Sequence, residues 1–263
     1  DFRKFNPNGA AIIRNEKWNE GDIFKQEELA NTLRRIAAKG RDGFYKGATA
    51  DLIVAEMKKG NGIITHKDLE DYKAIWRNPI VGYYKGYKVI SMPPPSSGGI
   101  ALMALLQSVE NYPLKKWGFQ SDSTIRAMVE AERRIYADRA THMGDPDFYR
   151  VPVDQLIDAK FNQDRMSKVS LAKATNSDDV KATKFPGYES EETTHFSIVD
   201  KDGNAVSLTT TINGSYGSYV WVDGAGFLLN NEMDDFFFFF LYPNMYGLLG
   251  GNANVIELNK RMV

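Results

Sequence analysis

The chain contains no cysteine and only three histidines, His66, His142 and His195. The lack of cysteine excludes disulfides, thiolate metal sites and a thiol nucleophile, but it leaves the compartment open. The chain also has no large excess of positive or negative charge, because 33 Lys and Arg residues are balanced by 34 Asp and Glu residues. The near-neutral balance gives no electrostatic case for binding nucleic acid or an anionic membrane. No apolar run is long enough for a membrane helix.

Several chemical signatures are missing as well. The sequence has no HExxH or other metal spacing, no GxSxG elbow, and no GxGxxG or Walker A phosphate loop. It therefore carries none of these metal or cofactor motifs. His195 stands in a strand-like stretch, where a histidine is more often structural than catalytic. The NNEMDD cluster, residues 230–235, stays open between a polar loop, a calcium site and a pocket for a ligand ammonium group.

The chain has 263 residues, of which 43% are hydrophobic, enough for one large domain or two small ones. It begins at Asp1 without an initiator Met, lacks a signal-peptide pattern and stops at NKRMV. We expect both ends to be cut from a longer protein.

The first 165 residues predict a mainly helical block. The expected helices cover residues 26–40, 48–60, 66–72, 100–110 and 122–143. The apolar face of the first is expected at Leu29, Leu33, Ile36 and Ala37, with Gly40 closing the helix. The inward face of the last is expected at Ile125, Met128, Val129, Ile135 and Tyr136.

Strand signals follow two different patterns. Residues 75–84 and 87–92 are strand-like, and the PPPSSGG that follows them is expected to shape the backbone. Residues 165–192 are polar and predict an exposed linker. After it, HFSIV and AVSLTTTI alternate around an Asp-Gly turn, which predicts a hairpin.

Thr193 stands where the linker gives way to the hairpin. A threonine hydroxyl is a poor nucleophile unless a base takes its proton. A cut before Thr193 would create an α-amine of pKa near 7.7–8.0 beside that hydroxyl. One residue would then supply nucleophile and base, and an exposed linker accommodates such a cut. Taken alone, a Thr-Thr pair is better explained as β-branched residues opening a strand.

The stretch THFSIVDKDGNAVSLTTTINGSYG, residues 194–217, resembles the signature of the γ-glutamyltranspeptidase family. Further resemblances follow in collinear order: MPPPSSGGI, YADR, GDPDF, LLNNEMDDF and PNMYGLLGG. Members of the family are roughly twice as long as this chain, so we interpret the sequence as an internal fragment.

The resemblance implies an α+β fold, part of the four-layer αββα sandwich of the N-terminal nucleophile hydrolases. It implies self-cleavage between Glu192 and Thr193. Residues 1–192 would then end the large, helix-rich subunit, and residues 193–263 would begin the small catalytic subunit. The two subunits would pair. Thr193 would next attack the γ-glutamyl amide of glutathione or a related compound, forming an ester released to water, an amino acid or a dipeptide.

Carried over by position, Thr193 is the nucleophile and Thr211 orients its hydroxyl. Asn213, Glu232 and Asp235 would hold the substrate α-ammonium group, whose three donors suit carboxylate and amide oxygens. Tyr246 matches a lid tyrosine. The resemblance also implies a periplasmic or secreted protein and no cofactor. The family's carboxylate-binding arginine, serine pair and oxyanion-hole glycines would lie outside residues 1–263, so we expect this segment alone to be inactive.

Two other functions stay open. One is a related acylase or poly-γ-glutamate depolymerase on the same fold, and the other is an unprocessed, inactive relative that acts as a binding protein. The run FFFFF at residues 236–240 departs from the family's polar loop. It is an apolar lid, a pocket-lining segment or a stretch of unreliable residue identities. We favour the last, because the run has the loop's length and none of its chemistry.

Overall fold

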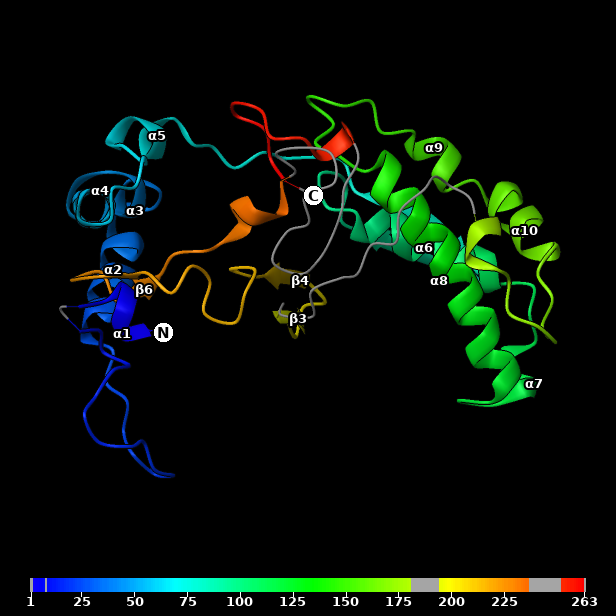
Figure 1. The fold of residues 1–263 in the computed structure, drawn as a ribbon, viewed down its shortest axis with the longest axis horizontal. Coiled ribbons are helices and arrows are strands. Elements are labelled where there is room, and N and C mark those ends of the chain that lie inside the picture. Colours follow the sequence, from blue (N-terminus) through cyan, green and yellow to red (C-terminus); the bar gives the residue numbers. More distant parts are fainter. Residues whose placement is uncertain (1, 8, 181–193, 237–251, 263) are drawn as a thin grey trace. The chain divides into compact units, whose positions relative to one another are not determined.

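The computed structural model of the chain describes residues 2–7, 9–180, 194–236 and 252–262 (Figure 1). It divides into two compact units, one formed by residues 1–75 and 190–232 and the other by residues 76–189 and 233–263. The helices and 3-10 turns are α1 (Phe2–Phe5), α2 (Glu27–Lys39), α3 (Asp42–Tyr45), α4 (Gly47–Lys59), α5 (His66–Asp71), α6 (Gly98–Val109), α7 (Leu114–Trp117), α8 (Asp122–His142), α9 (Val153–Leu156), α10 (Ala159–Ser167), η1 (Ser177–Asp179), η2 (Glu232–Asp235) and η3 (Asn252–Asn254). The strands are β1 (Ile80–Tyr84), β2 (Tyr87–Ser91), β3 (Thr194–Val199), β4 (Ala205–Thr210), β5 (Trp221–Val222) and β6 (Phe227–Leu228).

All five helices expected from the sequence are present, and local signals account for their ends. Gly40 follows α2 with φ of 55°. Thr65 begins α5 through a capping box with Asp68, and the Ser121 side chain accepts the Thr124 N–H at the start of α8. These contacts satisfy backbone groups that a helix end leaves without an intrahelical partner.

The first unit packs α2 and α4 against the β5–β6 hairpin. Ile53, Val222 and Ala225 form its buried apolar cluster. Thr32 in α2 is buried and donates its hydroxyl to the Ala225 carbonyl at 2.7 Å. A Cβ on Gly226, at φ of 79°, would lie 2.3 Å from a backbone nitrogen of α2, so the turn approaches the helix backbone closely.

The predicted apolar face of α2 is only partly buried. Leu33 is 55% exposed and Ala37 is also exposed, whereas Thr32 is buried. The β5–β6 turn contacts the side of the helix that carries Thr32, and the hydroxyl–carbonyl bond compensates for burying a polar side chain there. Backbone approach, and not the largest apolar side chains, sets this face.

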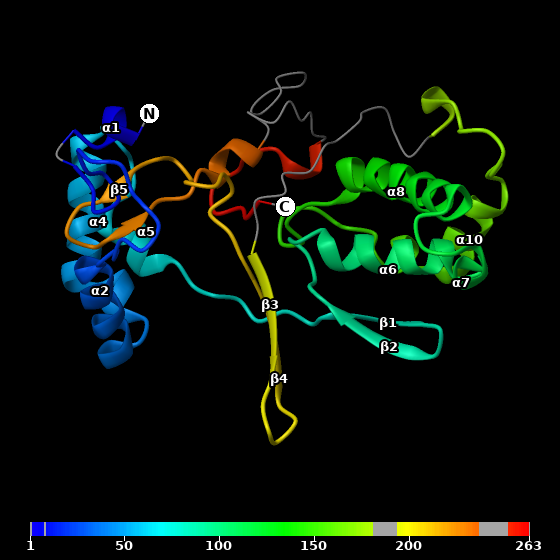
Figure 2. The same ribbon diagram turned by 90° about the horizontal axis from the view of Figure 1, so that it is seen from below.

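The second unit is organised around α6, which contacts α8, α10 and the β1–β2 hairpin. Figure 2 shows α6 between α8 and that hairpin. Two buried clusters line the helix, and both consist of its apolar side chains with those of its neighbours: Ala101, Ala104, Val109, Ala131, Ile135 and Met166 in one, and Ile80, Ile100, Met103, Met143 and Leu156 in the other.

The predicted inward face of α8 is wrong at three positions. Ile135 is buried as predicted, but Ile125, Met128 and Val129 are 48%, 36% and 44% exposed. The buried residues include alanines and two carboxylates, Ala127, Glu130, Ala131, Ala137 and Asp138. Small side chains let α6 come close, and ion pairs with arginines compensate the buried carboxylates. Hydrophobicity alone therefore selects the wrong side of the helix.

The PPPSSGG stretch shapes the backbone, as predicted. A Cβ on Gly99 would lie 2.0 Å from the Met92 carbonyl oxygen, so the chain folds back on itself at the start of α6. The Ser97 hydroxyl accepts a hydrogen bond from Arg139 Nε at 2.8 Å, which ties this turn to α8.

The β3–β4 hairpin confirms the Asp-Gly prediction. Its register pairs Thr194 with Thr210 and Val199 with Ala205. The Asp200 carboxylate accepts the N–H groups of Asp202 at 2.9 Å and Asn204 at 2.8 Å, which fixes the turn. Every residue of both strands is exposed, and in the described part of the chain no third strand joins them.

The predicted linker, residues 165–192, is held by other parts of the fold at its start. Arg165 and the buried Met166 still belong to α10, and the backbone at Thr175 bonds to α8. Residues 181–192 lie outside the described residues.

No helix of the described part combines the length and the apolar character needed to cross a membrane.

Candidate active site

Four residues singled out from the sequence lie in the described structure: Thr211, Asn213, Glu232 and Asp235. The remaining three, Glu192, Thr193 and Tyr246, lie outside it. Thr211, Asn213 and Glu232 belong to the first compact unit, whereas Asp235 is assigned to the second.

Thr211 and Asn213 follow directly after β4. The Thr211 hydroxyl oxygen accepts the Asn213 backbone N–H at 2.9 Å. This bond turns the chain, and Asn213 takes a left-handed conformation with φ of 69°, which asparagine tolerates better than most residues. Asn213 is only 7% exposed, while Thr211 is exposed. The strand thus ends in a sharp turn that carries both predicted side chains.

A second segment, residues 229–231, lies against this turn. The Asn231 N–H donates to the Ile212 carbonyl at 3.2 Å, and the Asn231 Oδ1 accepts the Gly214 N–H at 2.8 Å. A Cβ on Gly217 would lie 2.1 Å from the Leu229 carbonyl oxygen. These contacts fix Asn231 beside the turn, and Glu232 is the next residue in the chain. Asn213 and Glu232 are therefore brought together by backbone contacts.

Glu232 and Asp235 are the first and last residues of the 3-10 turn η2. The two residues are three apart, a spacing at which side chains of a 3-10 helix eclipse one another. The Asn230 Oδ1 accepts the Glu232 N–H at 3.0 Å and so satisfies a donor at the start of η2. Within the described ranges, no three His, Cys, Asp or Glu side chains gather as metal ligands.

His195 lies on the polar face of the β3–β4 hairpin. Its Nδ1 bonds the Thr209 hydroxyl at 2.8 Å and its Nε2 bonds the Ser207 hydroxyl at 3.1 Å. A hydroxyl can donate or accept, so either neutral tautomer of the ring is satisfied. The histidine links the two strands that lead to and from the candidate site.

Two asparagines that the sequence reasoning left without a role, Asn230 and Asn231, hold the site together. Both side chains accept backbone N–H groups at the turn. The signal that could have identified them is the doubled asparagine directly before an acidic turn, because asparagine side chains favour such backbone contacts. In the phenylalanine run, Phe236 is buried, at 6% exposure; the other residues lie outside the described part.

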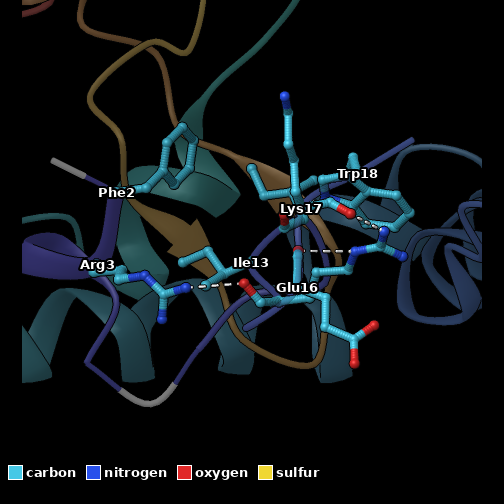
Figure 3. A pocket seen from close by; sticks show the side chains of 8 residues that line it. Phe2, Arg3, Ile13, Glu16, Lys17 and Trp18 are labelled. Atoms are coloured by element: carbon cyan, nitrogen blue, oxygen red, sulfur yellow. Dashed lines mark hydrogen bonds between the residues drawn. The ribbon is translucent and has the colours of Figure 1, made fainter. Parts of the chain in front are cut away.

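A separate pocket lies in the N-terminal part of the first unit (Figure 3). Its cavity volume is about 590 Å³, and its lining includes Phe2, Arg3, Ile13, Lys17 and Trp18. The Arg3 guanidinium donates to the Arg14 carbonyl at 2.9 Å across it. No predicted site residue lines this pocket, so it is distinct from the candidate site.

The comparisons with known proteins converge on one family. The sequence matches the family description "Gamma-glutamyltranspeptidase" over residues 3–263. It is 46% identical over 246 residues to a protein of Escherichia coli named glutathione hydrolase proenzyme, an alignment that covers 94% of this chain and 42% of the relative. The chain thus spans less than half the length of that curated relative.

Two solved structures resemble the fold. The gamma-glutamyltranspeptidase of Helicobacter pylori is 42% identical with a TM-score of 0.65, covering 68% of this chain and 52% of that chain. A cephalosporin acylase from Bacillus halodurans is 26% identical with a TM-score of 0.75, covering 99% of this chain and 43% of that chain. The predicted fold class, α+β and part of the N-terminal nucleophile hydrolase sandwich, is confirmed by these likenesses.

Proposed function

Because this chain belongs to the gamma-glutamyltranspeptidase family, we propose that it is part of a self-cleaving γ-glutamyl transferase and hydrolase with Thr193 as its nucleophile. The protein would take the γ-glutamyl group from glutathione or a related amide and pass it to water, an amino acid or a dipeptide. The names of the relatives support this proposal, since the Escherichia coli protein is a glutathione hydrolase proenzyme.

The register of the β3–β4 hairpin carries the proposal. It pairs Thr194 with Thr210, so one further step of the same register would set position 193 opposite Thr211. Directly opposed residues of an antiparallel pair have Cβ atoms roughly 4.5–5.5 Å apart, which is within reach of two hydroxyl groups. The Thr211 oxygen is already oriented by the Asn213 N–H. The hairpin thus supports Thr211 as the residue that orients the nucleophile.

The self-cleavage step requires only the chain itself and water. The Thr193 hydroxyl attacks the Glu192 carbonyl, the C–N bond breaks, and an ester with a free Thr193 amine results. Water hydrolyses that ester. Residues 1–192 then end one subunit and residues 193–263 begin the other, and we propose that the two remain paired.

The mature reaction reuses the same hydroxyl. The Thr193 amine accepts the hydroxyl proton, directly or through water, while the oxygen attacks the γ-carbonyl of the donor. The proton passes to the departing amine, and a γ-glutamyl ester remains on Thr193. Water or the amine of an acceptor then attacks this ester and regenerates the hydroxyl.

Donor selectivity would come from the turn at Asn213 and from η2. The η2 turn carries the Glu232 and Asp235 carboxylates three residues apart, and the Asn213 side-chain amide supplies a further oxygen. Three oxygens of this kind suit the three donors of an ammonium group. This set favours donors with a free α-amine over the plain dicarboxylic acyl groups of the acylase alternative. Periplasmic or secreted location is part of the proposal and rests on the family.

A denaturing gel of the natural protein that contains this chain tests the proposal. We expect two bands, with the smaller beginning at Thr193 by N-terminal sequencing, and cleavage of γ-glutamyl-p-nitroanilide. Thr193→Ala should leave one band and no turnover. Continued cleavage at that bond would sink the mechanism. A single inactive band in the unaltered protein would instead favour the binding-protein alternative.

A further inference from the structure

Asn254 contacts the backbone of Asp235 from the loop that carries η3. Its amide Nδ2 donates to the Asp235 carbonyl oxygen at 2.9 Å. Asn254 is 9% exposed, and its Oδ1 is buried without a hydrogen-bond partner in the described part of the chain. Both residues belong to the second compact unit. A buried asparagine therefore holds the residue predicted to bind the substrate ammonium group.

The loop of Asn254 is itself fixed at two places by the GDPDF stretch, residues 144–148. A Cβ on Gly144 would lie 2.4 Å from the Ala253 carbonyl oxygen, so the two backbones touch and only glycine fits. The Asp145 carboxylate, fully buried, accepts the Arg261 N–H at 2.8 Å and pairs with Arg77 at 3.4 Å. Residues 253–261 are thus anchored on both sides of Asn254.

This contact matters because Asp235 ends a very short helix. The last carbonyl groups of a helix lack intrahelical partners, and 3-10 turns have poor hydrogen-bond geometry. The Asn254 amide supplies the partner for the Asp235 carbonyl. It thereby restrains the backbone dihedrals that determine where the Asp235 carboxylate points.

We propose that Asn254 is a positioning residue for recognition of the donor's α-ammonium group and acts through Asp235. The inference rests on the proposed function and adds a residue to its site. Misplacement of a binding group by about 1 Å can cost as much as 100-fold in rate. Asn254 would therefore set selectivity between donors that carry the α-amine and donors that lack it.

The test uses the natural protein that contains this chain and two donors, γ-glutamyl-p-nitroanilide and glutaryl-p-nitroanilide, which differ by the α-amino group. The measured quantity is the ratio of their kcat/KM values. We expect Asn254→Ala to lower this ratio roughly tenfold, the effect of about 1.4 kcal/mol, with glutaryl-p-nitroanilide turnover nearly unchanged. Asn254→Leu keeps the branching of the side chain, although it is larger, and serves if the alanine variant does not fold.

Asn162→Ala is the matched control. Asn162 is 1% exposed and donates to Gln107 Oε1 and the Leu156 carbonyl, both at 2.9 Å. Its loss should lower the melting temperature without moving the donor ratio. A merely structural role for Asn254 would give the same pattern as Asn162, and that outcome would overturn the inference.

Asp235→Asn separates this inference from the proposed function. If the unaltered protein does not prefer the amino-bearing donor, or Asp235→Asn keeps the preference, the proposed ammonium site is wrong. If Asp235→Asn abolishes the preference and Asn254→Ala keeps it, only the role of Asn254 is wrong. In the Asp235→Asn background, Asn254→Ala should not lower the donor ratio further, because Asn254 acts through Asp235.

Discussion

The buried carboxylate of Glu130 accepts a hydrogen bond from the backbone N–H of Thr175 at 2.8 Å. Glu130 is 2% exposed and also pairs with Arg134 at 2.6 Å and Arg133 at 3.3 Å. Arg133 in turn donates to the Thr175 carbonyl at 2.8 Å. Helix α8 therefore fastens the polar stretch that leads toward the proposed cleavage bond.

Replacing Glu130 with glutamine should destabilise the fold. The substitution removes a buried charge that three donors satisfy and leaves two arginines without their carboxylate. Hydrogen bonds to charged groups contribute about 1.5–3 kcal/mol, so we expect a loss of about 2 kcal/mol in the free energy of unfolding. Urea denaturation measures it. Glu132→Gln on the same helix should change the value by less than about 0.5 kcal/mol.

The same contact predicts a pH dependence. Burial opposes ionisation of Glu130, but the Thr175 N–H and Arg134 outweigh it and lower its pKa from 4.5 to about 2. A carboxyl whose folded pKa is depressed stabilises the fold above its unfolded pKa, and this contribution fades as pH falls from 4.5 toward about 2. The stability gap between the unaltered protein and Glu130→Gln should therefore narrow on acidification. A gap that stays constant between about pH 6 and pH 3 would contradict the assignment.

Thr211→Val should slow γ-glutamyl transfer while leaving the fold intact. The side chain is exposed, so losing its hydrogen bond to the Asn213 N–H should cost only about 1 kcal/mol of stability, whereas in our proposal the hydroxyl orients the nucleophile. Loss of one such hydrogen bond corresponds to roughly a 10- to 100-fold fall in kcat. Thr211→Ser should retain most of the rate. Thr209→Val removes a hydroxyl that bonds His195 Nδ1 on the hairpin, and equal slowing by both valine variants would argue against a special role for Thr211.

Adjacent glycines at the start of α6 predict opposite effects of the same substitution. A Cβ on Gly99 would lie 2.0 Å from the Met92 carbonyl oxygen, whereas a Cβ on Gly98 would meet nothing closer than 3.5 Å. Gly99→Ala should destabilise by about 1–3 kcal/mol, because the backbone must shift. Gly98→Ala should be neutral or stabilising by up to about 1 kcal/mol, since alanine favours helix. Thermal denaturation of the two variants compares them directly.

The parts of the fold that the sequence predicts well are those set by local chemistry. Ser121 caps α8, and an Asp-Gly turn closes β3–β4 with the expected pairing. The inward face of α8 was not predictable in this way. Ala127 and Ala131 face inward because α6 approaches closely, and Glu130 is buried because arginines and Thr175 surround it. Arg133 and Arg134 lie on the same helix as Glu130, but α6 and Thr175 come from distant parts of the chain and leave no periodic signal.

The site divides in the same manner. The signature residues Thr211, Asn213, Glu232 and Asp235 could be named because they stand in a long motif, and their roles stay proposals. Asn254 was missed because its relation to Asp235 exists only after the η3 loop has packed on Gly144. No residue type or spacing in the sequence predicts a buried side-chain amide that donates to a backbone carbonyl.

The turn at Asp200 fixes the register of the β3–β4 hairpin, and the chemistry proposed at the far end of the hairpin depends on that register. Side chains alternate along a strand, so a slip of one residue moves each side chain to the other face. The hydrogen bonds of the Asp200 carboxylate fix the length of the turn, and this length sets the register that pairs Thr194 with Thr210. An added residue within one strand alone would shift this pairing, and with it the residue that our proposal sets opposite Thr193, although no atom near Thr194 or Thr210 had been altered.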